Sequence, residues 1–364
     1  MPEHPPPVKR HLDRLYAESE RRYACRADSP EAFRQWLSPA RREFRQLLGL
    51  PRIAELAADH SPSVTMAGDT ENLDGYSRRR GWIETDPNAR IPFWQLTPAG
   101  EGPFPLALTP HGHGNGDTYV GLPDDAITKK RIEEEDRDVA VQAVRRGFAT
   151  IAPYTRGLGP NPQNFRIADI ANRHDSDCRG HNWHVITAGR TALGERVWDL
   201  LRLVDWALER DEVNSSPVLV LGSSGGGMVT LHAAACDERI GIAVPCCAYN
   251  NYVSFAGTLR HCPCNAVPGL LQFGEMWDVA GLIAPRPLLT VNGREDSLHP
   301  VEEVDQAVER LRAIYSAAGV PANYEHRYGE GGHRIYSDLM WPWIEQHAAG
   351  TYRVVAYNRP STGR

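Results

Sequence analysis

The feature that most constrains the fold is a short apolar run that ends in a turn of glycines and serines. Residues 218–221 are typical of a buried strand, Gly222-Ser223-Ser224-Gly225-Gly226 follows at once, and residues 228–236 continue as a helical segment. The turn matches the pattern G-x-S-x-G with Ser224 at its centre, because the frame centred on Ser223 would need a glycine at position 221. A serine on a sharp strand-to-helix turn needs neighbours almost without side chains, so this pattern predicts that Ser224 is a nucleophile.

A purely structural turn is the alternative interpretation of these glycines, since short glycine-serine patterns are common by chance. A phosphate-binding loop is excluded, because no lysine follows the glycines and the pattern G-x-G-x-x-G is not matched. The helix that follows favours the catalytic interpretation, because its N-terminus would add partial positive charge where an oxyanion forms.

Short apolar runs alternate with helical patterns along most of the chain, which predicts an α/β fold with a mostly parallel central sheet flanked by helices. The predicted strands are a hairpin of residues 76–85 and 91–96, then 104–109, 148–152, 218–221, 240–244, 287–291 and 324–328. The predicted helices are 139–146, 193–208, 301–316 and 339–348. We expect residues 1–70 to form a helical N-terminal extension with disordered, proline-rich first residues, and residues 71–364 to form one catalytic domain.

A nucleophilic serine needs a base and an acid that orients the base, and in this kind of fold they follow the serine in the order acid, then histidine. Asp296 stands in a loop just after the predicted strand 287–291 and is the expected acid, with Glu295 as the alternative. His333 follows Gly331-Gly332 after the last predicted strand and is the expected base. His326 lies within that strand and is expected to be structural.

A second glycine-rich loop follows the predicted strand 104–109. It reads His111-Gly112-His113-Gly114-Asn115-Gly116. Acyl transfer needs two backbone N–H groups that face the oxyanion, one from the residue after the nucleophile and one from such a loop. Gly225 and either His113 or Gly114 are the expected donors, and a plain glycine turn is the alternative for the loop.

Composition excludes several other classes of protein. Lysine and arginine number 40 against 46 acidic residues, a net charge of −6, which argues against a nucleic-acid partner. No apolar stretch reaches the length of about 18 residues that a membrane span needs, and the N-terminus lacks the apolar core of a signal peptide. Seven cysteines are an odd number at low density, so we expect reduced cysteines and a cytoplasmic location.

Several polar residues near the predicted strand ends are candidates for substrate contacts. They are His111, Tyr154, Arg156, Trp183 and His299. Arg156 also suits a structural ion pair. A cluster of His174, Asp175, Asp177, Cys178, His181 and His184, and a second of His261, Cys262 and Cys264, contain metal-ligand types. Neither has a recognised zinc spacing with a matching second half, so no metal is expected. Cys246 and Cys247 are expected to be buried small apolar residues.

These motifs in this order resemble the α/β-hydrolase superfamily. Further segments are similar to its acetyl-xylan-esterase-like and dienelactone-hydrolase-like branch, over roughly residues 33–350: Arg156-Gly157-Leu158-Gly159, Leu282-Ile283-Ala284-Pro285-Arg286-Pro287-Leu288-Leu289, His261-Cys262-Pro263-Cys264-Asn265, Val267-Pro268-Gly269-Leu270 and Glu330-Gly331-Gly332-His333. One departure is Gly225, where some relatives that cleave glucuronoyl esters carry arginine directly after the nucleophile.

The resemblance implies a serine-dependent hydrolase that forms an acyl-enzyme and needs no cofactor. Its expected substrates are small carboxylic esters, which include acetyl esters of sugars or natural products. Hydrolysis of amides, lactones or C–C bonds by the same triad is one alternative. A catalytically degenerate binding module is another. The sequence leaves open the substrate, the acyl length and the oligomeric state.

Overall fold

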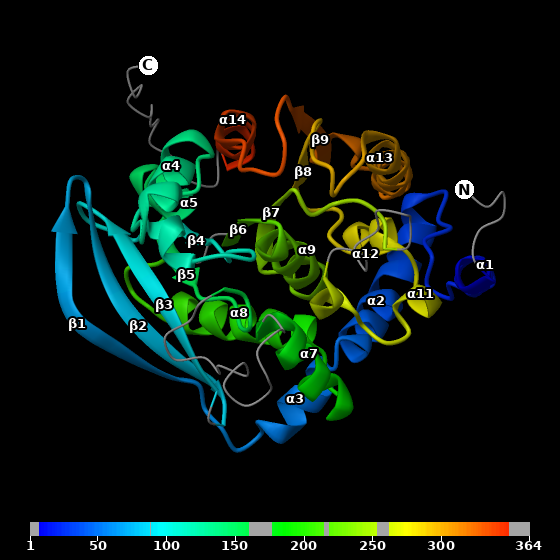
Figure 1. Cartoon of the computed structure of the whole chain (residues 1–364), viewed down its shortest axis with the longest axis horizontal. Coiled ribbons are helices and arrows are strands. Elements are labelled where there is room, and N and C mark those ends of the chain that lie inside the picture. The colour runs from blue at the N-terminus through cyan, green and yellow to red at the C-terminus, as the bar shows by residue number, and fades with distance from the viewer. Residues whose placement is uncertain (1–6, 88, 160–176, 215–217, 253–261, 349–364) are drawn as a thin grey trace.

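In the computed structural model the chain folds around a nine-stranded sheet (Figure 1). The structure describes residues 7–87, 89–159, 177–214, 218–252 and 262–348. The strands are β1 (Ser63–Leu73), β2 (Tyr76–Asp86), β3 (Ala89–Pro98), β4 (Leu106–Leu108), β5 (Ala149–Pro153), β6 (Val218–Ser223), β7 (Ile240–Cys246), β8 (Leu288–Gly293) and β9 (Tyr324–Gly329). Their order is β1-β2-β3-β5-β4-β6-β7-β8-β9. Strands β4 to β9 pair in parallel, whereas β1, β2 and β3 form an antiparallel meander that joins the sheet through the antiparallel β3–β5 pair. The predicted α/β fold and mostly parallel sheet are confirmed.

Helices cover the sheet. The α-helices are α1 (Pro7–Ala17), α2 (Pro30–Leu47), α3 (Leu50–Leu56), α4 (Ala126–Glu134), α5 (Val139–Arg145), α7 (Asp177–Thr187), α8 (Ala192–Leu208), α9 (Gly225–Cys236), α11 (Leu270–Phe273), α12 (Met276–Gly281), α13 (Val301–Ala317) and α14 (Ser337–Ala348). Short 3-10 helices are η1 (Gly116–Val120), η2 (Pro263–Asn265) and η3 (Pro321–Asn323). No helix among the described residues is long and apolar enough to span a bilayer.

Alternate residues of the central strands pack against different helices, because successive side chains of a strand point to opposite faces. On β6, Val218 and Val220 belong to the apolar core that includes residues of α2, α8, α9 and α13. Leu219 and Leu221 belong to a second core with residues of α5 and α14. Both faces of β6 are therefore covered, which explains why its first four residues, Val218 to Leu221, are all apolar.

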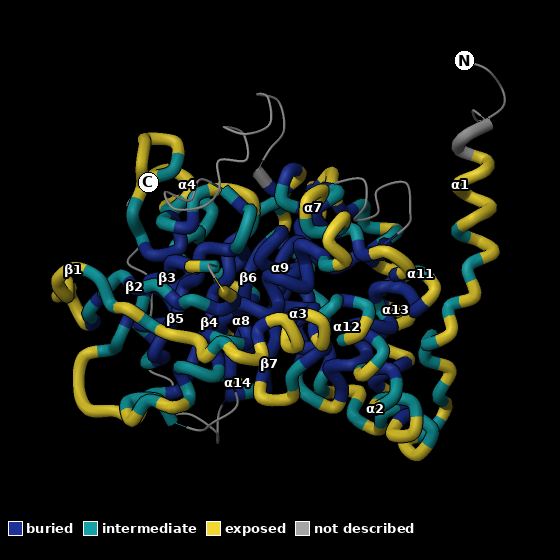
Figure 2. Tube along the Cα trace, turned by 90° about the horizontal axis from the view of Figure 1, so that it is seen from below, coloured by how far each residue is buried: buried dark blue, intermediate teal, exposed yellow. Residues whose placement is uncertain are grey.

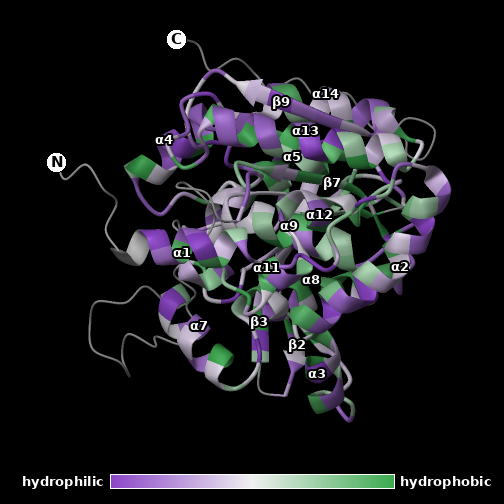
Figure 3. Cartoon of the chain, turned by 90° about the vertical axis from the view of Figure 1, so that its right-hand side faces the viewer, coloured by the Kyte–Doolittle hydropathy of each residue, from purple (hydrophilic) through white to green (hydrophobic). Residues whose placement is uncertain are grey.

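The N-terminal part of the chain contains the expected helices. Helix α2 begins at Ser29, whose side chain accepts a hydrogen bond from the backbone N–H of Ala32, and it buries Phe33, Ala40 and Phe44 in the main core. Hydrophilic and hydrophobic residues alternate along α2 in Figure 3, as expected for a helix with one buried face. Helix α1 stands apart from the body of the molecule in Figure 2.

The helices of this part agree with the sequence-based expectation, but the boundary of the extension does not. Helix α2 ends before Gly49, which adopts a left-handed φ of 80°, and α3 begins at the next residue. Strand β1 begins at Ser63, before the expected boundary at residue 70, and pairs with β2 over most of its length. The sheet thus already begins within the segment that was expected to be a helical extension. The first residues, 1–6, whose disorder was expected, lie outside the described residues.

The long segment between β5 and α8 holds a helix that is absent from the elements predicted from the sequence. Helix α7 spans Asp177–Thr187, and its side chains show no clear apolar stripe, which is why the periodicity gave no signal. The loop after β4 likewise contains η1 and α4. These elements lie beyond the carboxyl ends of β4 and β5, on the side of the sheet where ligands bind in parallel α/β folds.

Candidate active site

Ser224 occupies the turn between β6 and α9, with a backbone φ of 57° and ψ of −123°. A left-handed φ is costly for a residue with a side chain and is typical of a functional turn. The loop after β4 packs closely against this turn, which explains why glycines flank Ser224. A Cβ on Gly222 would lie 2.5 Å from the carbonyl oxygen of Pro110, and a Cβ on Gly226 would lie 2.0 Å from the same atom. The first and last glycines of the pattern therefore allow the loop after β4 to reach the serine.

Asp296 and His333 are brought together by the ends of β8 and β9. The Nδ1 atom of His333 lies 2.7 Å from Oδ2 of Asp296, and Oδ1 of Asp296 accepts a hydrogen bond of 3.0 Å from the backbone N–H of Leu298. A carboxylate only accepts, so Nδ1 of His333 carries the hydrogen and Nε2 keeps its lone pair when the ring is neutral. Glu295, the alternative acid, is exposed.

The environment of Asp296 favours its charged form. Only 3% of its surface is exposed. Burial alone would raise the pKa of the Asp296 carboxyl, but the hydrogen bond from His333 and the nearby imidazole of His299 hold this pKa below its usual value. A charged carboxylate is the form that fixes the tautomer of the adjacent histidine.

The loop after β4 contacts the nucleophile turn through Gly112. A Cβ on Gly112 would lie 3.0 Å from Cβ of Ser224 and 3.1 Å from the backbone nitrogen of Gly225. Gly225 and His113 line the same cavity as Ser224, whereas Gly114 does not and instead lines a neighbouring depression. Of the two alternative donors in this loop, the structure therefore places His113 beside the serine.

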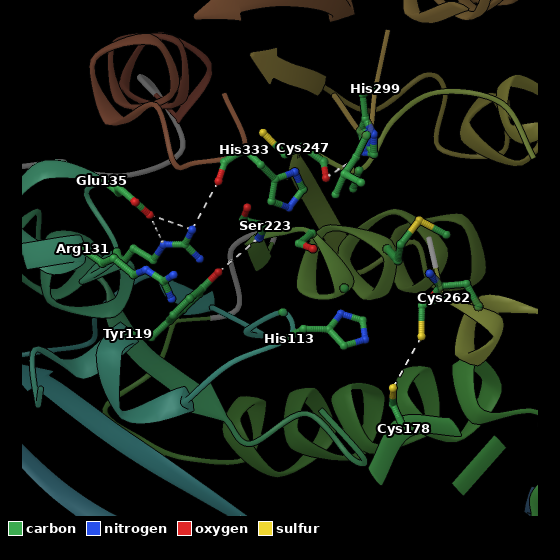
Figure 4. A pocket seen from close by; sticks show the side chains of 18 of the residues that line it. His113, Tyr119, Arg131, Glu135, Cys178, Ser223, Cys247, Cys262, His299 and His333 are labelled. Atoms are coloured by element: carbon green, nitrogen blue, oxygen red, sulfur yellow. Dashed lines mark hydrogen bonds and ion pairs between the residues drawn. The ribbon is translucent and has the colours of Figure 1, made fainter. Parts of the chain in front are cut away.

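These groups surround one cavity of about 710 Å³ at the carboxyl ends of the parallel strands (Figure 4). The cavity is lined by Gly112, His113, Tyr119, Arg131, Glu135, Arg137, Cys178, Arg179, Ser223, Ser224, Gly225, Met228, Cys247, Ala248, Cys262, Asn265, Leu298, His299 and His333. Its size is typical of a site for a small molecule. The lining includes three arginines and one glutamate, so the cavity is polar and carries positive charge.

His299 is the one expected substrate contact that lines this cavity. Its Nε2 donates a 3.1 Å hydrogen bond to the carbonyl oxygen of Cys247, and its ring packs edge-on to the ring of His333 with centroids 5.9 Å apart. Trp183 lies on α7 with 62% of its surface exposed and does not line the cavity, so its expected role is not supported.

His111 was expected to contact substrate, but both nitrogens of its ring lie next to backbone groups of the protein. Only 2% of the residue is exposed, Nδ1 lies 2.7 Å from the carbonyl oxygen of Gly112, and Nε2 accepts a 3.0 Å hydrogen bond from the backbone N–H of Thr155. Burial lowers the pKa of His111 to about 4, so its ring is neutral and joins the loops after β4 and β5.

Tyr154 is likewise a buried structural residue. Its hydroxyl donates to Oδ1 of Asp117, which also accepts a 2.9 Å hydrogen bond from the indole of Trp94. Neither Tyr154 nor His111 lines the cavity around Ser224. The structure therefore does not place these two side chains at the cavity, because each is buried.

Arg156 serves the ion-pair role that was the alternative to substrate binding. Its guanidinium donates to Oδ2 of Asp199 at 2.9 Å, to Oε2 of Glu195 at 3.0 Å and to the hydroxyl of Thr85 at 3.1 Å. Burial opposes the charged form, but Asp199 and Glu195 together raise the pKa of Arg156 above its usual value. This network ties the loop after β5 to α8 and β2, below the cavity.

The polar cluster before α8 separates in the structure, and its Cys178 lies beside Cys262 and Cys264 of the second cluster. His181 lies 2.6 Å from Oε2 of Glu195 and joins the network of Arg156, while His184 is exposed and Cys178 is buried at the cavity. His174 and Asp175 lie outside the described residues, as does His261. His326 is structural as expected, with Nδ1 2.8 Å from the hydroxyl of Thr290.

Two cavity residues had no signal in the sequence. The hydroxyl of Tyr119 accepts a 3.2 Å hydrogen bond from the backbone N–H of Ser223 and so holds the turn that contains Ser224. Arg137 donates a 3.3 Å hydrogen bond to the carbonyl oxygen of His333 and forms an ion pair with Glu135 at 2.8 Å. Tyr119 and Ser223 are 104 positions apart, and Arg137 and His333 are 196 positions apart. No local pattern could therefore have identified these contacts.

Comparison with known proteins identifies the family of this chain. No protein-family model matches the chain. The chain is 30% identical over 240 residues to a Bacillus subtilis protein named "Putative hydrolase YtaP", and the match covers 64% of this chain and 74% of that protein. The chain belongs to this hydrolase family. The hydrolase is also 24% identical over 205 residues to "4-O-methyl-glucuronoyl methylesterase 1" of Wolfiporia cocos, over 47% of this chain and 50% of that protein.

Solved structures share the fold of the hydrolase at lower sequence identity. A "putative acetyl xylan esterase" from Bacteroides fragilis superposes with a TM-score of 0.73 at 18% identity and covers 93% of this chain and 94% of its own. A glucuronoyl esterase from Solibacter usitatus superposes with a TM-score of 0.62 at 14% identity, over 88% and 93%. The expected α/β-hydrolase fold is therefore confirmed.

Proposed function

We propose that this hydrolase cleaves a small carboxylic ester through an acyl-enzyme on Ser224. The observation that carries the proposal is a single cavity lined by Ser224 and His333, in which Asp296 holds His333 by a hydrogen bond of 2.7 Å. A nucleophile, a base and an orienting acid from three strand ends form the arrangement that activates a serine hydroxyl.

The proposed reaction runs in two halves. Nε2 of His333 takes the proton of Ser224 as Oγ bonds to the ester carbonyl carbon, and the charged Asp296 stabilises the resulting imidazolium. The carbon–oxygen bond to the alcohol then breaks, and His333 gives its proton to the departing oxygen. Water, deprotonated by His333, attacks the acyl-enzyme and releases the acid, which restores the serine hydroxyl.

Backbone N–H groups of Gly225 and of His113 are the proposed donors to the oxyanion. Gly225 is the first residue of α9, whose N-terminus carries partial positive charge. The close approach of Gly112 to Gly225 supports a role for the neighbouring His113 as the second donor. Loss of one such donor typically lowers kcat about 100- to 1,000-fold.

The lining of the cavity favours a polar substrate. Arg131 and Glu135 lie on one side of it in Figure 4, and Arg137 is paired with Glu135; together they offer hydrogen bonds to an oxygen-rich alcohol, such as a sugar. Acetyl esters of sugars or of natural products fit this description, and one similar solved structure is named as a putative acetyl xylan esterase. Gly225 leaves no arginine directly after the nucleophile, which favours these esters over glucuronoyl esters.

Labelling with a fluorophosphonate probe tests the nucleophile. Wild-type protein is expected to be labelled, Ser224→Ala is expected to lose the label, and Ser223→Ala is expected to keep it, because Ser223 is a buried strand residue with 3% of its surface exposed. Unlabelled wild-type protein, as a catalytically degenerate binding module would be, or equal labelling of Ser224→Ala, would contradict the proposal.

A hydrolysis screen tests the bond that is cleaved. Turnover of acetylated sugars and activated short-chain esters supports the ester assignment. Turnover of amides, lactones or C–C bonds without any turnover of activated esters would favour the alternative reactions of the same triad. The screen includes Ser224→Ala as the background control for each substrate.

A further inference from the structure

Four metal-ligand side chains from three distant segments meet at the edge of the cavity. We refer to them as the Cys3His cluster, which consists of His113, Cys178, Cys262 and Cys264. Their ligand atoms all lie within 4.8 Å of one another. The loop after β4, the first turn of α7 and the segment of η2 supply them. In Figure 4, Cys178 and Cys262 face each other and the ring of His113 points toward the pair.

The distances in the cluster fit a tetrahedral metal better than a disulfide. The sulfur atoms of Cys178 and Cys262 are 3.5 Å apart, and Nε2 of His113 is 3.7 Å from the sulfur of Cys264. A tetrahedral zinc ion with Zn–S of about 2.3 Å and Zn–N of about 2.0 Å places sulfur pairs about 3.8 Å apart and sulfur–nitrogen pairs about 3.5 Å apart.

Cys262 and Cys264 are the closest pair, with sulfur atoms 2.9 Å apart. This separation is well beyond a disulfide bond of about 2.05 Å. Coordination of zinc would move the two sulfur atoms apart by about 1 Å. A short C-x-C segment accommodates such a movement by rotation of the side chains.

Burial and charge around the cluster also suit a thiolate site. Exposed surface is 3% for Cys178, 8% for Cys262 and 0% for Cys264, and the three cysteines form a small buried cluster with Leu158. Arg196 donates to both the carbonyl oxygen and the sulfur of Cys264 at 3.4 Å. Three thiolates and one imidazole around Zn²⁺ carry a net charge of −1, which this buried guanidinium would balance.

We propose that the Cys3His cluster binds one Zn²⁺ ion as a structural site. Four protein ligands leave no open position for substrate, which distinguishes structural zinc from catalytic zinc. His113 lies in the loop that also holds Gly112 against the nucleophile turn, so the ion would fix this loop to α7 and η2. The ion thereby acts as a positioning element for the oxyanion site and takes no part in the reaction.

The sequence analysis expected no metal because each cysteine segment by itself lacks a zinc spacing. Cys178 and Cys262 are 84 residues apart, and His113 and Cys264 are 151 residues apart. Only the fold brings them together. The ligand types are nonetheless the Cys3His set found in structural zinc sites.

Metal analysis of the full-length protein tests the site. Protein loaded with Zn²⁺ and then freed of excess metal is expected to hold about one zinc per chain, and Cys178→Ala and Cys264→Ala are expected to lose most of it. Cys236→Ala is the matched control, because Cys236 is equally buried but lies at the end of α9, outside the cluster. Co²⁺ loading is expected to give a thiolate charge-transfer band in wild type and in Cys236→Ala, and to give none in the cluster variants.

A second measurement needs no variant and so does not depend on how the variants fold. In wild-type protein, zinc is expected to protect Cys178, Cys262 and Cys264 from alkylation, and a chelator is expected to expose them. Zinc-free protein after loading, a disulfide within the cluster, or unchanged zinc content in the folded cysteine variants would overturn the proposal. Loss of zinc in Asp296→Asn with retention in Cys178→Ala would also overturn it, because Asp296, His333 and Cys247 form the other group of possible ligands among the described residues.

Discussion

The imidazole of His333 is hydrogen-bonded to Asp296 at 2.7 Å, although the two residues are 37 positions apart and end different strands. Strands β8 and β9 pair in parallel with Gly293 opposite Gly329, so the loops that follow them leave the sheet side by side. The pairing therefore brings the loop of Asp296 next to the loop of His333. Asp296 turns inward, whereas Glu295 turns to solvent.

Replacement of this acid is the first test of the arrangement. Asp296→Asn is expected to lower kcat by about 1,000- to 10,000-fold with little change in KM, because an amide no longer fixes the tautomer of His333 or stabilises its charged form. Steady-state kinetics on an activated acetyl ester measure the effect. Glu295→Gln is the matched control and is expected to keep kcat near the wild-type value. A large loss in Glu295→Gln would assign the acid to the neighbouring residue.

Gly112 offers a test of the oxyanion loop. In Gly112→Ala, the new Cβ would lie 2.7 Å from the carbonyl oxygen of Ser223 and 3.1 Å from the backbone nitrogen of Gly225, so the loop must move away from the nucleophile. We expect kcat to fall about 100- to 1,000-fold while the circular dichroism spectrum stays that of the folded protein.

Gly332→Ala is the control for this change in another loop of the same site. A Cβ at Gly332 would meet the carbonyl oxygen of Glu295 at 3.6 Å, which is an ordinary contact. Its kcat is expected to stay close to that of wild type. Equal activity of the two alanine variants would show that the loop with Gly112 does not position an oxyanion donor.

Local sterics explain why the sharp turn at Ser224 could be predicted from the sequence. The left-handed turn at Ser224 and the approach of Pro110 to Gly222 and Gly226 both require glycines at fixed offsets from the serine. Asp296 could be predicted as a candidate acid because it follows a strand whose first residues are apolar, and His333 as a candidate base because it follows two glycines after the last strand. Strands β6 and β7 are almost entirely apolar and so are easily recognised, whereas β9 carries Glu325, His326 and Arg327.

Contacts between distant loops could not be predicted in the same way. His111 and Tyr154 stand at strand ends like the active-site residues, but Thr155 and Asp117 engage their polar atoms and bury them. Arg137 reaches His333 across 196 residues. Nothing in a local pattern distinguishes a polar side chain that faces the cavity from one that faces the neighbouring loop.

Substitution of Trp183 and substitution of His299 are expected to have different effects on the kinetics. Trp183 is 62% exposed and does not line the cavity, so Trp183→Ala is expected to leave kcat and KM unchanged. His299 packs edge-on against His333, so His299→Ala is expected to lower kcat/KM by about tenfold or more, as the base loses a positioning contact. Steady-state kinetics on one ester compare the two variants. A raised KM in Trp183→Ala would restore this residue to the substrate site.

The buried network of Arg156 predicts how stability depends on pH. Burial alone would raise the pKa of Glu195, but the hydrogen bond from His181 and the charges of Arg156 and Arg190 lower this pKa from 4.5 to about 2. A carboxyl whose pKa is lowered by folding stabilises the protein above its unfolded pKa, and this contribution is lost as the pH falls through its folded pKa. A shift of this size corresponds to a contribution on the order of 3 kcal/mol at neutral pH.

Glu195→Gln removes this contribution and isolates its pH dependence. At pH 7 the variant is expected to unfold at a lower urea concentration than wild type, because a buried guanidinium loses one of its two charged partners. The difference in free energy of unfolding is expected to shrink as the pH falls from about 4.5 toward 2, since Glu195 is then increasingly protonated in wild type as well. Urea unfolding at several pH values measures the difference, and Glu209→Gln, at the exposed C-terminal end of α8, is the control, with no pH-dependent difference expected. A difference that stays constant over this range would show that the charge of Glu195 does not contribute to folding.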